Sequence, residues 1–355
     1  MGYPCININL RKLKHNVRYI LNCCNNNHIE VYGVTKVFCA REEICRAILE
    51  AGINTLADSR MKNIENMKNL NCEKVLLRIP SISESGYVVK YCNMSLNSEL
   101  DTIKSLNKEA NKLHVKHKII LMLDLGDLRE GILPENIEDI VSEVIKLENI
   151  QLKGIGTNLT CYGGVIPDDD NLGALVEIKK HLEDKFSIVI DIVSGGNSSS
   201  LYKVINNTMI KGINNLRLGE SLLLGKETAF GNNIENCFND VFLLCGEIIE
   251  LKEKPSLPKG RIGMDAFGNK PSFVDEGLIK RAIINLGRQD IKLEGIHTKD
   301  KKIRILGASS DHLILDITKA ENRYKLGDKV EFLMDYGALL QSMTSEYVEK
   351  VYIDK

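Results

Sequence analysis

Val31-Tyr-Gly-Val-Thr-Lys-Val-Phe-Cys39 is the stretch that decides between two α/β folds. It opens with five apolar or small residues in a continuous run, which is typical of a parallel strand buried on both faces. An open nucleotide-binding sheet would follow such a first strand with a glycine-rich phosphate loop. Here the run is followed by Lys36-Val-Phe-Cys39, which contains no glycine. The stretch therefore favours a closed barrel over an open, doubly wound sheet.

Further apolar runs repeat this pattern along the chain, with amphipathic segments between them. The runs are Val31–Thr35, Asn54–Ala57, Lys74–Ile79, Met94–Asn97, Ile119–Asp124, Lys153–Asn158, Ile188–Ser194 and Asn215–Leu218. The amphipathic segments include Arg41–Ala51, Met61–Leu70, Ser98–Leu113, Glu135–Leu147 and Leu172–Asp184. Eight strand–helix units over about 200 residues match the size of a (β/α)8 TIM-type barrel. We therefore predict an α/β fold with such a barrel over residues 10–230.

The pattern changes after Gly231. Short β-type runs follow one another, separated by turns that carry lysine, proline and glycine: Val241–Leu251, Arg281–Leu286, Ile303–Gly307, His312–Ile317 and Lys329–Met334. This texture predicts a mostly-β domain over residues 231–355. Residues 3–9 alternate like a strand, and we expect them to join it.

The overall composition excludes several classes of protein. The net charge of the 355 residues is −1, and no apolar run is long enough to cross a bilayer, so we expect neither nucleic acid nor a membrane as partner. The N-terminal segment lacks the apolar stretch of a secretory signal, which indicates a cytoplasmic protein. The ten cysteines include no C-x-x-C pair, so we interpret them as reduced thiols and expect no metal site.

Residues at the ends of the predicted strands carry the functional signal, because barrel enzymes place their chemistry there. Lys36 follows the first run directly, although it could also be an exposed lysine that begins a loop. Ser194–Ser200 and Arg217–Glu220 end the seventh and eighth runs with hydroxyls, glycines and free backbone N–H groups that suit a phosphate. Each could also be an ordinary turn. A lysine beside a phosphate cradle is what pyridoxal phosphate requires.

These residues resemble the fold type III pyridoxal-phosphate enzymes, the superfamily of alanine racemase and eukaryotic ornithine decarboxylase. The resemblance covers nearly the whole chain. It implies that Lys36 binds the cofactor covalently, that Arg129 contacts its phenolic oxygen and that Arg217 faces its ring nitrogen. The implied cofactor-binding set is Lys36, Arg129, Asn158, Ser194, Asn197, Ser198, Arg217, Gly219 and Glu220.

Longer blocks are similar to the clostridial ornithine racemase branch of this superfamily. They include DLGDLREG (124–131), NLTCYG (158–163), SGGNSSS (194–200), DAFGNKP (265–271) and GASSDHLI (307–314). The branch implies a pyridoxal-phosphate-dependent racemase that interconverts L- and D-ornithine by removing and returning the Cα proton on opposite faces. The alternatives are a lysine or broad-specificity basic amino-acid racemase, and a non-catalytic pyridoxal-phosphate carrier.

Two departures from alanine racemase bear on the proton relay. Arg288 stands where that family has a catalytic tyrosine, and Asn158 stands where it has a histidine. Lys36 is therefore expected to act as one base, and the second base stays open. The candidates are Cys161, Ser310 and Asp311, with Tyr162 and His312 also considered.

The resemblance also implies how a basic substrate is recognised. Asp311 aligns with the aspartate that receives the distal amine in the decarboxylase branch, and Asp127 is the second choice for that role. Ser310 is expected to bind phosphate or substrate. In the decarboxylase branch the matching segment crosses the dimer interface, so we expect a homodimer with composite active sites.

Overall fold

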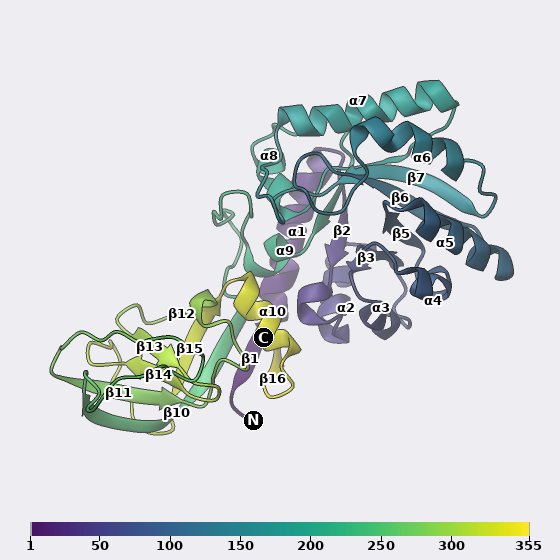
Figure 1. Cartoon of the computed structure of the whole chain (residues 1–355). Helices are drawn as coiled ribbons and strands as arrows, with labels where there is room; N and C mark the ends of the chain where they lie inside the picture. The colour runs from purple at the N-terminus through teal and green to yellow at the C-terminus, as the bar shows by residue number, and fades with distance from the viewer. Residues whose placement is uncertain (1, 355) are drawn as a thin grey trace. The chain divides into compact units, whose positions relative to one another are not determined.

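The computed structural model describes residues 2–354 and divides the chain into two compact units. One unit is Leu10–Asn239. The other combines the chain up to Asn9 with the chain from Asp240 onward. Figure 1 shows the elements of both.

The first unit is a closed barrel of eight parallel strands, which confirms the predicted fold. Its strands are β2 (Glu30–Val34), β3 (Thr55–Asp58), β4 (Glu73–Leu76), β5 (Met94–Asn97), β6 (His117–Leu123), β7 (Ile150–Thr157), β8 (Ile192–Ser194) and β9 (Asn215–Leu218). The strands pair in chain order, and β2 closes the barrel against β9 with Tyr32 opposite Arg217. Residues nearly 200 positions apart in sequence thus become neighbours.

Apolar side chains fill the interior of this barrel. Tyr32 and Val34 of β2 pack with Ala57, Met94 and Met122 from other strands. Successive strand residues point to opposite faces, so the alternate residues of β2 enter this cluster together. A packed interior leaves the barrel's chemistry to the ends of its strands.

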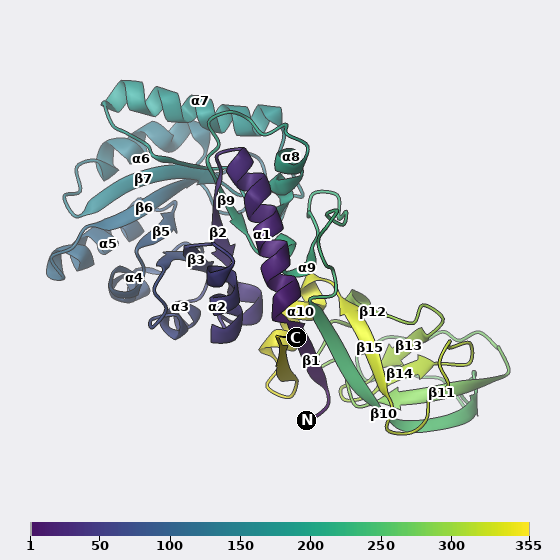
Figure 2. The ribbon, with the colours of Figure 1, turned by 180° about the vertical axis from the view of Figure 1, so that it is seen from behind.

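Helices surround the barrel on the outside. They are α1 (Leu10–Asn26), α2 (Glu42–Glu50), α3 (Met61–Asn66), α4 (Ser85–Tyr91), α5 (Leu100–Lys112), α6 (Ile137–Val144), α7 (Asp169–Phe186), α8 (Leu201–Ile205) and α9 (Glu220–Leu224). Figure 2 shows α1 lying along the barrel beside β2 and α9. Its buried residues Leu13, Asn16, Val17, Ile20 and Cys24 recur three or four positions apart, as one face of a helix requires.

The second unit is built on an eight-stranded sheet. Its strands are β1 (Cys5–Asn9), β10 (Phe242–Pro255), β11 (Leu278–Ile284), β12 (Ile296–Thr298), β13 (Arg304–Ala308), β14 (Leu313–Asp316), β15 (Lys329–Met334) and β16 (Glu349–Ile353). The N-terminal strand β1 lies between β10 and β16. The short strands β12 and β16 and the helix α10 (Tyr336–Thr344) lie outside the ranges named from sequence.

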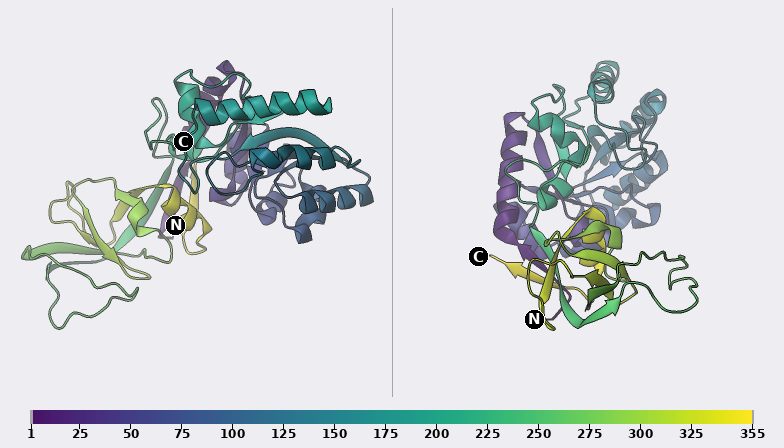
Figure 3. Two further views of the ribbon diagram at one scale, coloured as in Figure 1. Left: turned by 45° about the horizontal axis from the view of Figure 1, so that its top comes forward. Right: turned by 90° about the vertical axis from the view of Figure 1, so that its left-hand side faces the viewer.

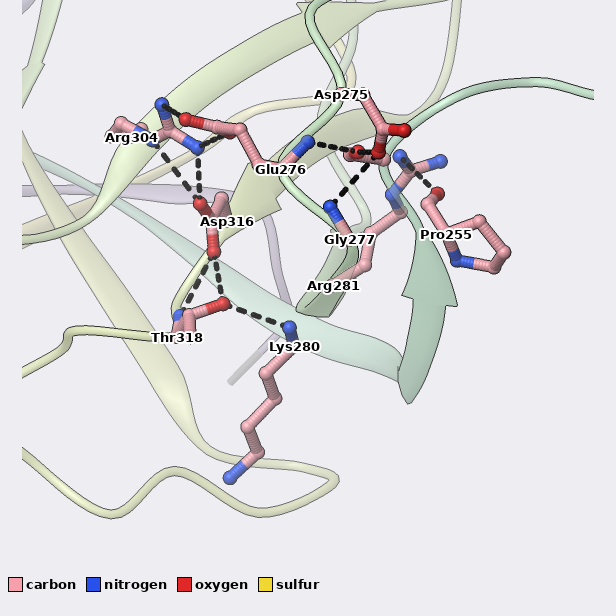
Figure 4. A network of polar contacts seen from close by, with 10 residues as sticks. Pro255, Asp275, Glu276, Gly277, Lys280, Arg281, Arg304, Asp316 and Thr318 are labelled. Atoms are coloured by element: carbon pink, nitrogen blue, oxygen red, sulfur yellow. Dashed lines mark hydrogen bonds and ion pairs between the residues drawn. The ribbon is translucent and has the colours of Figure 1, made fainter.

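A long connection, residues 256–277, leaves the sheet between β10 and β11 and runs out as an open loop (Figure 3). Arg304 of β13 holds its base: the guanidinium donates to Glu276 at the end of the loop and to Asp316 Oδ2 of β14 at 2.6 Å (Figure 4). Ser256 closes the other side, since its backbone N–H donates to the carbonyl oxygen of Gly277 at 2.8 Å. The two ends of the loop are thereby fastened to each other and to the sheet.

Candidate active site

Lys36 lies at the end of β2, in the mouth of the barrel. The preceding Thr35 is fully buried, and its hydroxyl donates to Asp58 Oδ2 at 2.5 Å. The backbone N–H of Thr35 also donates to the carbonyl oxygen of Ala57 at 2.9 Å. Lys36 then begins a short 3-10 turn and is exposed. Two bonds to β3 thus anchor the residue before a lysine whose amine stays accessible.

Arg217 lies at the end of β9 with its guanidinium buried in the same mouth. It donates to Ser194 Oγ at 2.5 Å, to the carbonyl oxygen of Thr157 at 2.7 Å and to Asn158 Oδ1 at 3.4 Å. Burial lowers the pKa of Arg217 to about 10. The guanidinium therefore stays protonated at neutral pH.

A group of hydroxyls and backbone donors follows β8 and β9. Ser198 Oγ accepts from the backbone N–H of Ser221 at 3.2 Å and donates to Ser221 Oγ at 3.1 Å. The hydroxyl of Ser199 is buried and has no hydrogen-bond partner within the described chain. A Cβ at Gly219 would lie 3.1 Å from Cβ of Val34, so this position leaves little room for a side chain. Ser221 was not among the residues predicted from the sequence. It could have been found as a hydroxyl in the first turn of the helix α9, which begins at Glu220.

Asn197 joins two strand-end loops. Its side-chain amide donates to Asn158 Oδ1 at 2.8 Å and to Cys161 Sγ at 3.4 Å, and its oxygen accepts from the backbone N–H of Ser199 at 2.8 Å. Cys161 is an exposed residue of the mouth. Partial desolvation of its thiol by the surrounding protein raises the pKa of Cys161, while the positive charges of Arg129 and Lys36 act in the opposite direction. The structure thus brings both Lys36 and Arg129 within electrostatic reach of Cys161.

Arg129 follows β6 and forms an ion pair with the adjacent Glu130. Glu130 Oε1 also accepts from Asn158 Nδ2 at 3.5 Å. Sequence reasoning missed Glu130, although an acidic residue directly after the arginine was visible. Its carboxylate links the loop after β6 to the residues around Arg217.

Asp127 is buried, and its carboxylate is already hydrogen-bonded on both oxygens. One oxygen accepts from the backbone N–H groups of Cys161 at 3.1 Å and Tyr162 at 2.8 Å, and the other accepts from Val165 at 3.2 Å. These bonds hold the pKa of Asp127 below its ordinary value against the opposing effect of burial. Asp127 therefore shapes the loop after β7, and its role toward a substrate stays a prediction.

The remaining predicted residues lie together in the second unit. The backbone N–H of Arg288 donates to the carbonyl oxygen of Ser309 at 2.9 Å. Asp311 accepts from Ser310 Oγ at 2.8 Å and from the side-chain amide of Gln289. His312 completes this tip, with its backbone N–H donating to Ser309 Oγ at 3.2 Å. The turn around Arg288 and the segment Ser309–His312, which sequence reasoning singled out separately, are thus in contact.

Among residues 2–354, no group of three or more histidine, cysteine, aspartate or glutamate side chains is arranged to hold a metal ion. Within that range, no helix is long and apolar enough to cross a membrane.

The comparisons with known proteins agree on one family. A family model described as the N-terminal domain of alanine racemase matches residues 8–226. The ornithine racemase of Acetoanaerobium sticklandii is 50% identical over 349 residues, covering 98% of this chain and 99% of that protein. The lysine racemase of Thermotoga maritima is 41% identical over 354 residues, covering 99% of both proteins.

The solved structures agree with the barrel and the sheet. The crystal structure of alanine racemase from Bartonella henselae, with covalently bound pyridoxal phosphate, aligns with a TM-score of 0.77. The alignment covers 99% of this chain and 100% of that one at 17% sequence identity. At that identity the likeness shows the fold alone.

Proposed function

Since the chain belongs to the alanine racemase N-terminal domain family, we propose that it is a pyridoxal-phosphate-dependent amino-acid racemase, an isomerase that interconverts L- and D-ornithine. The observation that carries the proposal is the 50% identity, across nearly the whole of both chains, with an ornithine racemase. The geometry of the barrel mouth supports it, because one mouth combines an accessible lysine, a buried arginine and a cluster of hydroxyls.

The residues of the mouth fit pyridoxal phosphate. Ser199 has a buried hydroxyl without a partner in the described chain, and Gly219 leaves little room for a side chain. Both features suit a phosphate that approaches the backbone closely and accepts hydrogen bonds from N–H groups and hydroxyls. Lys36 would hold the cofactor covalently, and Ser198 with Gly219 and Ser221 would bind its phosphate. Pyridoxal phosphate, when bound, supplies the electron-withdrawing ring that makes the Cα proton of the substrate acidic.

Lys36 and Arg217 have separate roles in this proposal. The amine of Lys36 takes the proton from Cα on one face and returns it there in the reverse direction. Arg217 would supply a protonated donor to the ring nitrogen of the bound cofactor without giving up its proton, because its guanidinium stays charged at neutral pH. That pairing would limit side reactions such as transamination. Ser194 and the carbonyl oxygen of Thr157 orient the guanidinium for this role.

The second base acts on the opposite face of Cα. Cys161 is an exposed residue near Lys36, whereas Ser310 and Asp311 lie in the other unit. We retain all three candidates. Replacing each candidate and measuring solvent deuterium exchange at Cα with each enantiomer distinguishes them. Loss of the second base should impair exchange of the Cα proton on its own face more than exchange on the face of Lys36.

The substrate's distal ammonium needs an acidic partner, because an unpaired charge is costly to remove from water. Several carboxylates near the strand ends are already engaged within the barrel: Asp58 and Asp127 are buried and hydrogen-bonded, and Glu130 pairs with Arg129. Asp311 accepts from two uncharged donors and is exposed. Asp311 is therefore the favoured partner for the ammonium, with Asp127 second. The 41% identity with a lysine racemase makes lysine the alternative substrate.

We further propose a cytoplasmic homodimer in which each active site takes Lys36 from one protomer and Asp311 from the other. Exposed apolar side chains support an interface on each unit. Leu128 and Tyr162 are 70% and 77% exposed at the barrel mouth, and Met264 and Val274 are 80% and 77% exposed on the long loop of the second unit. Such side chains are available for a protein–protein contact.

A chiral assay of the purified protein with ornithine, lysine and alanine tests the function. We expect ornithine to be racemised with the highest kcat/KM and alanine to be a poor substrate. If Asp311 is the partner of the distal ammonium, Asp311→Asn should lower kcat/KM for ornithine by at least tenfold and leave alanine nearly unchanged, whereas equal loss of both substrates would identify Asp311 as the second base. Equal turnover of alanine and ornithine would overturn the substrate. Bound cofactor without turnover of any amino acid would indicate a carrier.

A further inference from the structure

Both carboxylate oxygens of Asp311 are held by neighbouring side chains. The amide of Gln289 donates to Oδ1, and the hydroxyl of Ser310 donates to Oδ2 at 2.8 Å. A bond to each oxygen fixes the rotation of the carboxylate about its last side-chain bond. An ionised carboxylate has about four acceptor positions, so two bonds leave acceptor capacity for a ligand.

The backbone beneath this triad (Gln289, Ser310 and Asp311) is also fastened. The N–H of Gln289 donates to the carbonyl oxygen of Ser310 at 3.2 Å. A Cβ at Gly287 would lie 1.9 Å from that same carbonyl oxygen, so the close approach requires glycine. Gln341 of α10 donates to the carbonyl oxygen of Arg288 at 2.7 Å and holds the turn from its other side. The turn and the β13–β14 tip therefore hold the triad together.

The chemistry of the two donors matters as much as their positions. An amide and a hydroxyl are uncharged, so they orient the carboxylate without neutralising it. A lysine or arginine in either place would compete with a cationic ligand for the same oxygens. The triad thus holds the carboxylate in one orientation through uncharged donors, which leaves it available to pair with an ammonium group.

We propose that Gln289 and Ser310 are positioning residues that set the preference for a substrate with a second amino group, acting through the carboxylate of Asp311. The inference rests on the proposed function, in which Asp311 receives the distal ammonium of ornithine. It adds that the preference depends on how the carboxylate is held as well as on its charge.

A double-mutant cycle on the full-length holoenzyme tests the inference. Ornithine is compared with norvaline, which has the same carbon chain without the distal amine. Gln289→Ala should lower kcat/KM for ornithine about tenfold, mainly by raising KM, and leave norvaline within twofold, because a hydrogen bond to a charged group is lost. In the Asp311→Asn background the same substitution should change ornithine less than twofold, since its partner has lost the charge.

Two substitutions of Ser310 test whether its hydroxyl is what matters. Ser310→Ala should lower the ornithine preference, whereas Ser310→Thr, which keeps the hydroxyl, should retain it. Lys301→Ala, at an exposed turn of the same unit, is the matched control and should change neither substrate. Circular dichroism and Tm establish that each variant is folded.

The outcomes distinguish failure of the positioning role from failure of the substrate assignment. If Asp311→Asn leaves the ratio of ornithine to norvaline unchanged, Asp311 is not the charge partner and the substrate assignment fails. If Asp311→Asn harms ornithine selectively but Gln289→Ala does not, or if the two effects simply add, the positioning role is wrong and the substrate assignment stands.

Discussion

At the scale of single residues, the barrel mouth combines side chains fixed by hydrogen bonds with an exposed lysine. Thr35, Ser194 and Asn197 hold position, because their side chains bond residues of neighbouring strands or loops. Lys36 remains accessible among them. Lys36→Ala should therefore abolish covalent attachment of the cofactor while leaving the fold intact. Borohydride trapping followed by peptide mass spectrometry measures this, and a cofactor trapped on any other lysine would contradict the assignment.

His117 gives a second prediction at this scale. It is buried at the start of β6 beside Ser95, and burial lowers its pKa from 6.5 to about 4. As the pH falls from 6.5 toward 4, the unfolded chain takes up a proton that the folded chain does not, so stability decreases. The shift corresponds to a loss of about 3 kcal/mol across that window.

Replacing this side chain should remove its share of the acid sensitivity. His117→Gln cannot charge, and its Tm should fall less between pH 7 and pH 4.5 than that of the original protein. His297→Gln, at an exposed strand position, is the matched control and should behave like the original protein. A His117→Gln curve parallel to the original one would show that this histidine does not set the acid response.

At the scale of elements, loops are held by charged side chains at their bases. Asp127 fastens the loop after β7 through three backbone N–H groups, and Arg304 fastens the long loop of the second unit through Glu276 and Asp316. In both places one side chain makes several hydrogen bonds or ion pairs at the base of a loop that has no strand pairing of its own. Removing it should loosen the loop and leave the sheet behind it folded.

Arg304→Met tests this at the long loop (Figure 4). Asp316 is nearly buried and would keep its bonds to Thr318 but lose the guanidinium. We expect a loss of about 1–2 kcal/mol in stability and faster amide exchange across residues 256–277, measured by hydrogen-exchange mass spectrometry. Arg304→Lys keeps the charge but cannot bind two carboxylates at once. Its stability and amide exchange should therefore lie between those of the original protein and those of Arg304→Met. Unchanged amide exchange in Arg304→Met would show that Arg304 does not hold the base of the loop.

At the scale of the whole molecule, the prediction concerns the sharing of sites between protomers. Lys36→Ala and Asp311→Ala chains should each be inactive toward ornithine alone. When they are mixed and allowed to exchange under random pairing, about a quarter of the sites are intact at both positions, and activity should return in that proportion. Absence of activity in heterodimers verified by mass would rule out a shared site.

The sequence alone was sufficient for features that repeat locally. Buried parallel strands appear as short continuous apolar runs, so the eight strands and their closure into a barrel were predictable, as was the mostly-β character of the rest. The position of Lys36 directly after the first of these runs was equally visible. Longer blocks of sequence indicated the racemase family, because a family resemblance is written in residue order and needs no coordinates.

Only the tertiary structure decided which side chains meet. Arg217 bonds Ser194 and Thr157 because β7, β8 and β9 are successive neighbours in the barrel, so that their ends lie together. Gln289 meets Asp311 across 22 positions because the turn before η5 (Leu293–Gly295) packs on the β13–β14 tip. Asp127, a substrate candidate from sequence, binds backbone N–H groups of the loop after β7. Periodicity reports the burial of one element, whereas these contacts depend on how separate elements pack, which no local pattern records.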